Sequence, residues 1–251
     1  MKKYHTHVLV SLAACWAFAP TFSYAGETYK PAMFNFSSQE LLAKVSEAEA
    51  VTMASTSAIL YCQSDIDTLG VASVTSCYDQ ENNSSLVKQT EVALRKMPFD
   101  AAKIDGEAVP VRMSFTVAYA RSGEVLTAVL IPNLGSMQDR FGRDYIAPQE
   151  RLDVADWYNR YSKNSWVRGE AFLGAGPMAR VAATVDTKGK TDVVRTLDTD
   201  RAFKRDAKIV KNALRKSRFI PGFVDGKAVP MGYMAVVNYN DQSGEAVSAR
   251  D

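Results

Sequence analysis

Histidine is nearly absent from this sequence, and that scarcity excludes several kinds of chemistry. The only two histidines, His5 and His7, stand close to the first residue. Without histidine, the rest of the chain cannot form the Ser-His or Cys-His pair that activates a nucleophile, and it lacks the commonest metal ligand. No G-x-S-x-G, P-loop or G-x-G-x-x-G motif occurs either. We therefore expect a protein that is not an enzyme, with no catalytic residues, no metal site and no cofactor.

Long hydrophobic runs are also lacking. The apolar stretch from Val8 to Phe18 follows Lys2 and Lys3 and precedes the small-x-small pattern Ser23-Tyr24-Ala25. A membrane-spanning helix needs about 20 apolar residues, so this stretch is too short for a permanent span. It is typical of a secretory signal peptide, here residues 1–25, with cleavage after Ala25. The sequence thus predicts a periplasmic protein without a stable membrane span.

A second interpretation of the same segment stays open. Leu12-Ala13-Ala14-Cys15 is similar to a bacterial lipobox. Cleavage before Cys15 would leave a lipid-modified cysteine at the new N-terminus and make the protein an envelope lipoprotein. The apolar residues after Cys15 favour the signal peptide, because lipoproteins usually become polar at that point.

An excess of charge of either sign is missing too. The chain has 30 basic and 28 acidic residues, and the loss of Lys2 and Lys3 with the signal peptide leaves 28 of each. A neutral chain lacks the electrostatic attraction that nucleic acids and anionic membranes exert on basic proteins. We expect no nucleic-acid partner.

Cysteine is scarce, with Cys62 and Cys77 alone outside the N-terminal segment. Two thiols without histidine do not complete a structural zinc site, and their spacing is not the C-x-x-C of redox-active pairs. In an oxidising periplasm such a pair predicts a disulfide.

What the sequence does contain is an internal repeat. Ala93-Leu94-Arg95-Lys96 recurs 120 positions later as Ala213-Leu214-Arg215-Lys216. The same offset relates Phe99 to Phe219 and residues 105–110 to residues 225–230. Collinear matches of this density indicate a duplication.

Each copy has the same predicted order of elements. Turn residues at 67–70 and 186–189 separate two short apolar runs, which predicts a β-hairpin of strands 57–63 and 71–78, repeated at 180–185 and 191–196. Helical spacing follows at 86–97 and 203–214. Alternating strands at 109–119 and 229–239 close the units. The fold class is therefore α+β, with two tandem β-β-α-β units in which a helix covers an antiparallel sheet.

Cys62 and Cys77 lie on opposite arms of the first hairpin, so we expect a cross-strand disulfide, with Val181 and Thr196 at the matching places of the second.

The second copy resembles the TonB C-terminal domain. The resemblance rests on Ala213-Leu214-Arg215-Lys216, Arg218-Phe219-Ile220-Pro221, Asp225-Gly226-Lys227-Ala228-Val229 and the alternating strand that follows. Residues 55–122 are similar but more divergent. The resemblance implies two small domains that bind protein segments in the periplasm, with a link to outer-membrane transport or energy transduction. The chain lacks that family's uncleaved anchor and proline-rich spacer, and residues 174–179 keep a single proline of the motif that precedes the domain.

The resulting domain boundaries are a signal peptide at 1–25, a helical segment at 26–50, a first TonB-C-like domain at 51–125, a connector at 126–168 and a second domain at 169–251. Ser37 to Glu40 has the spacing of a capping box and predicts a helix over 39–50. Periodic apolar residues predict a helix over 149–161 in the connector.

The expected function is binding by strand addition, in which an extended segment of an envelope protein or receptor pairs with an exposed sheet edge. The cell-wall polymer is an alternative ligand, and a homo-oligomeric envelope scaffold without a peptide ligand is an alternative role. The predicted edges are the closing strands. Their candidate binding residues are Val109, Val111, Thr116, Val117 and Tyr119 in the first copy, and Val229, Met231, Val236, Val237 and Tyr239 in the second.

Overall fold

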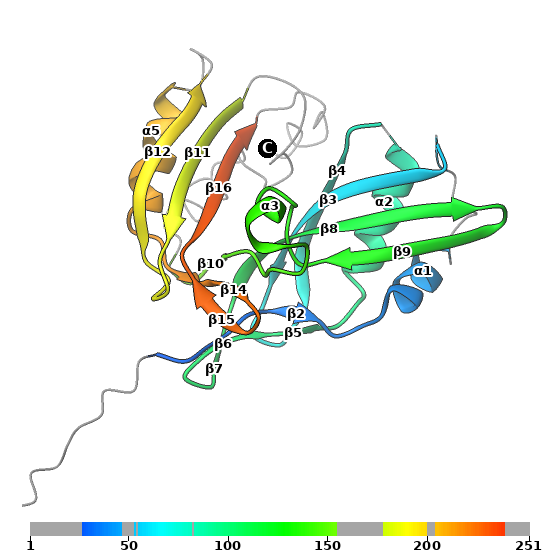
Figure 1. Cartoon of the computed structure of the whole chain (residues 1–251), viewed down its shortest axis with the longest axis horizontal. Coiled ribbons are helices and arrows are strands. Elements are labelled where there is room, and N and C mark those ends of the chain that lie inside the picture. The colour runs from blue at the N-terminus through cyan, green and yellow to red at the C-terminus, as the bar shows by residue number, and fades with distance from the viewer. Residues whose placement is uncertain are drawn as a thin grey trace, which may run out of the picture.

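The computed structural model describes residues 27–46, 53, 55–81, 83–154, 178–199 and 204–238 of the chain. These residues form a mixed α+β fold, mostly antiparallel strands in several sheets with a few short helices. Two sheets dominate, each with a helix on one face (Figure 1). Cys15, Ala25 and Tyr239 lie outside the described residues. Within the described part of the chain, no helix is both long enough and apolar enough to cross a membrane.

The elements of the first copy follow the predicted order. The hairpin consists of β3 (Ser57–Ile66) and β4 (Ala72–Asp79), followed by α2 (Ser84–Leu94) and β8 (Val111–Ser122). β3 lies between β4 and β8, and α2 packs on the face that buries Leu60 and Phe115.

A further helix, α1 (Ser38–Ser46), packs against α2 and against β9 (Val125–Ile131), the strand that follows β8. Its predicted capping box is confirmed. The Ser37 N–H donates to Glu40 Oε2 at 2.7 Å, and the Glu40 N–H donates to Ser37 Oγ at 3.2 Å. The Ser37 hydroxyl also donates to Glu40 Oε2, at 2.9 Å, and the two hydrogen bonds that this carboxylate accepts from Ser37 lower the pKa of Glu40.

The second copy repeats this arrangement. β11 (Met178–Val185) lies between β12 (Thr191–Thr199) and β16 (Met231–Asn238), and α5 (Lys204–Leu214) packs against the sheet. The strand orders β4-β3-β8 and β12-β11-β16 are therefore the same.

The hairpin turns match at the level of single atoms. Asp67 Oδ1 accepts hydrogen bonds from the Leu69 and Val71 amides, as Asp186 Oδ1 does from the Lys188 and Lys190 amides. Gly70 and Gly189 follow with φ of +79° and +66°. A Cβ at either glycine would lie within 2.0 Å of a phenylalanine carbonyl oxygen, that of Phe99 or Phe219, so only glycine fits.

The predicted closing strands are each divided in two by a proline. Pro110 separates β8 from β7 (Glu107–Val109), which pairs with β6 (Ala102–Ile104). Pro230 separates β16 from β15 (Lys227–Val229), which pairs with β14 (Gly222–Val224). Because proline has no N–H to continue a ladder, Val109 and Val229 belong to these small hairpins, and their assignment to the closing strands is wrong.

Two short strap segments were not predicted. In the first, residues 29–34, β1 (Tyr29–Lys30) pairs with β6, and β2 (Met33–Phe34) pairs with β5 (Phe99–Asp100). In the second, residues 145–151, Ile146 bridges to Phe223, and β10 (Gln149–Arg151) pairs with β13 (Phe219–Ile220). Phe34 pairs with Phe99, and Glu150 pairs with Phe219, the residue 120 positions after Phe99. Phe34 and Glu150 therefore occupy the same position in the two straps.

β10 also corrects the helix expected over 149–161. Residues 149–151 are a strand and residues 152–154 a turn; the remainder lies outside the described residues. β10 pairs with β8 on its other side, so one ladder β13-β10-β8-β3-β4 runs from the second copy into the first.

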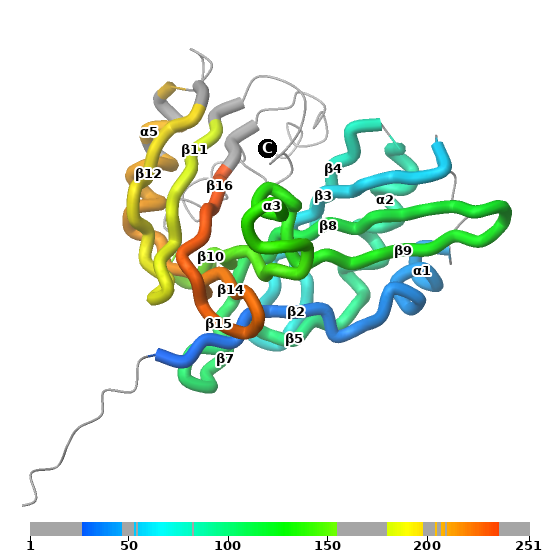
Figure 2. Tube along the Cα trace, viewed as in Figure 1, coloured from blue at the N-terminus to red at the C-terminus, as the bar shows by residue number. Residues whose placement is uncertain are grey.

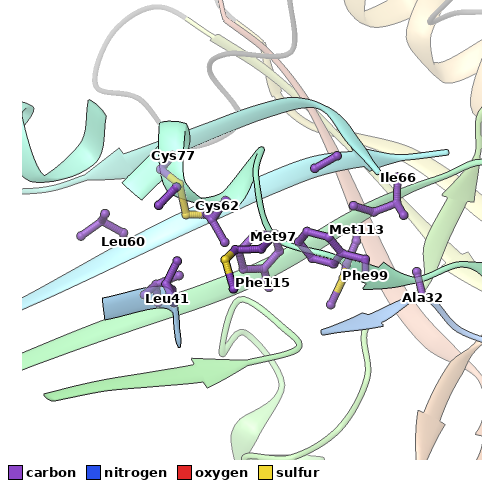
Figure 3. Close-up of a cluster of buried hydrophobic side chains, with 14 of the residues drawn as sticks. Ala32, Leu41, Leu60, Cys62, Ile66, Cys77, Met97, Phe99, Met113 and Phe115 are labelled. Atoms are coloured by element: carbon purple, nitrogen blue, oxygen red, sulfur yellow. A yellow bond between two sulfur atoms is a disulfide. The ribbon is translucent and has the colours of Figure 1, made fainter. Parts of the chain in front are cut away.

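The core of the first copy contains the predicted disulfide. Cys62 and Cys77 are direct partners across β3 and β4, and a disulfide joins them. Figure 3 shows the bond beside Met97 and Phe115, in a cluster of buried side chains. In the second copy, Val181 and Thr196 are direct partners at the matching place.

Candidate functional site

The two strands predicted to be binding edges, β8 and β16, have different neighbours in the structure. β8 is not an edge: β3 pairs along one side of it, and β9 and β10 pair with the two ends of the other side. The prediction of an exposed edge in the first copy is therefore wrong. β16 pairs with β11 alone among the described strands, so its other edge has no strand partner there.

The second side of β8 has a gap. β9 pairs with residues 116–122 and β10 with residues 111–112, which leaves residues 113–115 without a strand partner on that side in the described structure. Continued in register, β9 would place Pro132 opposite Phe115, and β10 would place Pro148 opposite Ser114. Neither proline has an N–H to donate, so both ladders end there.

The loop of residues 132–148 leaves the sheet at this gap and is closed at its base by the Ala147 N–H, which donates to the Pro132 carbonyl at 3.2 Å. Its organiser is Asn133, which is fully buried. The Asn133 side-chain amide donates to the carbonyls of Arg143 and Tyr145, and its oxygen accepts from the Gly135 N–H. Figure 2 shows α3 (Gln138–Phe141), the helix of this loop, between β16 and the β8–β9 pair.

A cavity of about 270 Å³ lies between this loop and the two sheets. Tyr61 and Ser114 line it from the outer face of the first sheet, and Gln80 lies beside them. The loop contributes Leu134, Ser136, Met137, Tyr145, Ala147 and Pro148. The second sheet contributes Gly232, Tyr233 and Met234 of β16. Successive side chains of a strand point to opposite faces, so three consecutive lining residues place the cavity along the edge of β16 that no described strand pairs with.

A buried polar cluster lies next to the cavity. Arg112 makes two hydrogen bonds to Asp65, from Nε at 2.7 Å and from Nη2 at 2.9 Å, and both side chains are about 5% exposed or less. Burial alone lowers the pKa of Arg112, but the charge and hydrogen bonds of Asp65 reverse this effect and raise it. The Arg112 guanidinium therefore stays charged in the buried pair.

Glu150 extends the cluster from β10. Its carboxylate accepts hydrogen bonds from the Ser217 and Tyr233 hydroxyls, each at 2.9 Å, and it is fully buried. Burial, followed by the Glu150 charge, raises the pKa of Tyr233 well above its usual value. Tyr233 thus remains a neutral hydrogen-bond donor that joins the cavity wall to the cluster.

Comparison of the two copies shows that three polar residues of this cluster stand where the first copy has apolar residues. Glu150 occupies the strap position of Phe34, while Ser217 and Tyr233 lie 120 positions after Met97 and Met113. The first copy fills these three positions with apolar side chains, and the second with three hydrogen-bonded polar ones. Arg112 corresponds in turn to Gly232, which has no side chain.

None of the described candidate residues predicted from the sequence lines the cavity. Val111, Val117 and Tyr119 point into the first core, and Met231 is also buried. Alternation along β8 predicts that Thr116 points away from the core, toward solvent. It is nevertheless only 5% exposed, because the loop covers it and its hydroxyl donates to the Asn133 carbonyl. Val236 and Val237 lie on β16, where they pair with Arg180 and Ala179.

The residues that sequence reasoning missed are those of the 132–148 loop. Its residues fall within the predicted connector, 126–168. The available signals were Pro132 and Pro148, which flank it, and Asn133, a residue that often organises a turn. None of these predicts that the loop returns to the sheet.

Comparison of the chain with protein-family models, with curated proteins and with solved structures finds no match.

Proposed function

We propose that this protein is an exported binding module of the cell envelope that captures an extended peptide segment along the edge of β16 that has no partner among the described strands. The observation that carries the proposal is the cavity lining, in which three consecutive β16 residues border a space that no described strand fills. An extended segment placed there would gain main-chain hydrogen bonds from the edge and side-chain contacts from the cavity.

We further propose that the two copies are tandem TonB-C-like domains behind a cleaved signal peptide. The support is their common strand order, the matched Asp-Gly turns and the residues of the second copy that resemble that family. The partner would then be a periplasmic segment of an envelope protein or outer-membrane receptor.

The test is photo-crosslinking in the periplasm followed by mass spectrometry. The photoreactive residue replaces Ser136 or Met234 at the cavity, and Val193, which is 63% exposed on β12, serves as the matched control. We expect one envelope protein to be captured from both cavity positions and not from Val193. Equal capture from all three positions, or none from the cavity, would contradict the proposal.

A second candidate is a self-associating envelope scaffold. Exposed apolar residues on two edge strands favour it: Val193 and Leu197 on β12, and Val125 and Val129 on β9. Unpaired, apolar strand edges promote pairing between chains. A solution mass that falls from oligomer to monomer on dilution would support the scaffold, and a monomer at all concentrations would exclude it.

A further inference from the structure

The chemistry of the cavity indicates what part of a ligand it accepts. None of the described residues that line it is charged; the lining includes tyrosine and methionine side chains together with the polar side chains of Gln80, Ser114 and Ser136. A charged group moved from water into this space would lose its hydration without meeting a charged side chain in the lining, and the adjacent Arg112–Asp65 pair is already mutually bonded, which disfavours binding. The lining therefore favours an uncharged occupant.

The volume of the cavity limits which uncharged groups can occupy it. At about 270 Å³ it is smaller than the pockets of about 300–1,000 Å³ that enclose whole drug-sized ligands. A single large side chain fits such a volume. The lining includes three tyrosines, Tyr61, Tyr145 and Tyr233, and two methionines, Met137 and Met234, residue types that make favourable contacts with an aromatic guest.

Gly232 gives a ligand access to this space. It is an exposed residue in the interior of β16, and its backbone does not require glycine, because its φ is not positive. A Cβ built there would meet only Met137 Sδ, at 3.7 Å, which is an ordinary contact. Neither the backbone angle nor a clash at Cβ requires glycine here, and the missing side chain leaves room beside the strand for another backbone to approach.

We propose that this cavity is a specificity pocket for one aromatic side chain, carried by the extended segment that pairs with β16 beside Gly232. The inference rests on the proposed function and adds the chemical class of the residue that the site selects. An aromatic anchor in a desolvated pocket is the typical source of affinity in an interface of this kind.

The experiment uses blocked amino acids as probes of the full-length mature chain. N-acetyl-tryptophanamide and N-acetyl-phenylalaninamide are titrated against the isotope-labelled protein, and the amide signals of Ser114, Met137 and Gly232 are followed by NMR. We expect saturable shifts at these signals, and binding weaker by at least about tenfold for the corresponding lysine and aspartate amides. Equal shifts with the charged probes, or no shifts at these residues, would overturn the proposal.

A series of variants at Gly232 tests whether the probes bind in the cavity. Gly232→Ala and Gly232→Val fill the space in two steps, and β-branched valine is well tolerated in strands. We expect progressively weaker binding of the tryptophan probe, by at least about tenfold for valine. Thr196→Val, at an exposed position of β12, is the control and should bind as the unmodified protein does. Undiminished binding by a folded Gly232→Val would contradict the assignment.

The outcome is separable from that of the crosslinking experiment. Probe binding without capture of an envelope protein would leave the pocket in place and remove the proposed partner. Capture from Ser136 and Met234 without probe binding would keep the binding edge and remove the aromatic specificity.

Discussion

Tyr119 on β8 is a buried phenol in the first core, 2% exposed, and its hydroxyl lies 2.9 Å from Thr90 Oγ1 on α2. Burial raises its pKa to about 12, partly offset by the Thr90 hydrogen bond. The unfolded chain would have a tyrosine pKa of about 10. The neutral form is thus favoured in the folded state, so the associated stability is complete below about pH 10 and is lost as the pH rises through about 12.

This titration predicts a steep loss of stability in alkali. A shift of about two pKa units corresponds to about 3 kcal/mol, which the unmodified protein should lose above pH 10. Tyr119→Phe should be less stable at pH 8, by about 1–2 kcal/mol for the lost hydrogen bond, yet lose less between pH 10 and 12. Urea unfolding across pH 8–12 measures both effects. Parallel pH profiles for the two proteins would show that Tyr119 does not carry the effect.

At the scale of elements, the straps hold the two copies together. The Gln149 side chain accepts a hydrogen bond from the Ala32 N–H and donates one to the Ala32 carbonyl, both at 2.8 Å. The Tyr29 hydroxyl donates to the Lys188 carbonyl at 3.0 Å, in the hairpin turn of the second copy. The first strap is therefore anchored to the second copy as well as to its own.

Replacing Gln149 with the residue of the equivalent strap tests this link. Gln149→Met installs the side chain that Met33 provides in the first copy and removes both hydrogen bonds to Ala32. The Ala32 amide, left buried without its acceptor, should exchange with solvent at least about tenfold faster, with a stability loss of about 1–3 kcal/mol. Hydrogen exchange followed by NMR measures this, with the Leu60 amide of β3 as an internal reference. Unchanged exchange at Ala32 would show that the two hydrogen bonds between Gln149 and Ala32 contribute little to stability.

The straps also explain which parts of the fold the sequence could predict. Both hairpins, both covering helices and the disulfide came from periodicity, turn residues and the repeat, because those signals are local. Strands of two or three residues, such as β2 and β10, carry no detectable period and are defined only by their distant partners. The position of Glu150 was also unpredictable, because a carboxylate is not expected at a fully buried position.

The candidate site was harder to predict for the same reason. Thr116 has the polar character of an outward position, and alternation alone assigns it to solvent. Its cover is the 132–148 loop, whose path depends on Asn133 contacts across ten and twelve residues. The cavity is formed by segments that no local pattern relates to one another.

At the scale of the whole molecule, β10 joins the copies into one unit. It lies between β8 and β13 and places Glu150 within the electrostatic range of Arg112. Unfolding the first copy alone would remove the β8 partner of β10 and take the Arg112 cation away from Glu150, which is packed against Ser217 and Tyr233 of the second copy. A Glu150 that stays buried there without its nearby cation is costly, so independent unfolding of the copies is disfavoured.

This coupling predicts that a bond in one copy stabilises both. The disulfide closes a loop with a separation of 15 residues, worth about 3 kcal/mol. Cys62→Val with Cys77→Thr installs the pair that the second copy has in the same register, Val181 and Thr196. We expect a single unfolding transition at lower urea, with hydrogen-exchange peptides from β3 and β11 shifted together. The reciprocal variant, Val181→Cys with Thr196→Cys, should raise both midpoints. If β11 keeps its original midpoint when the native disulfide is removed, the copies unfold independently and β10 is a contact between two separate domains.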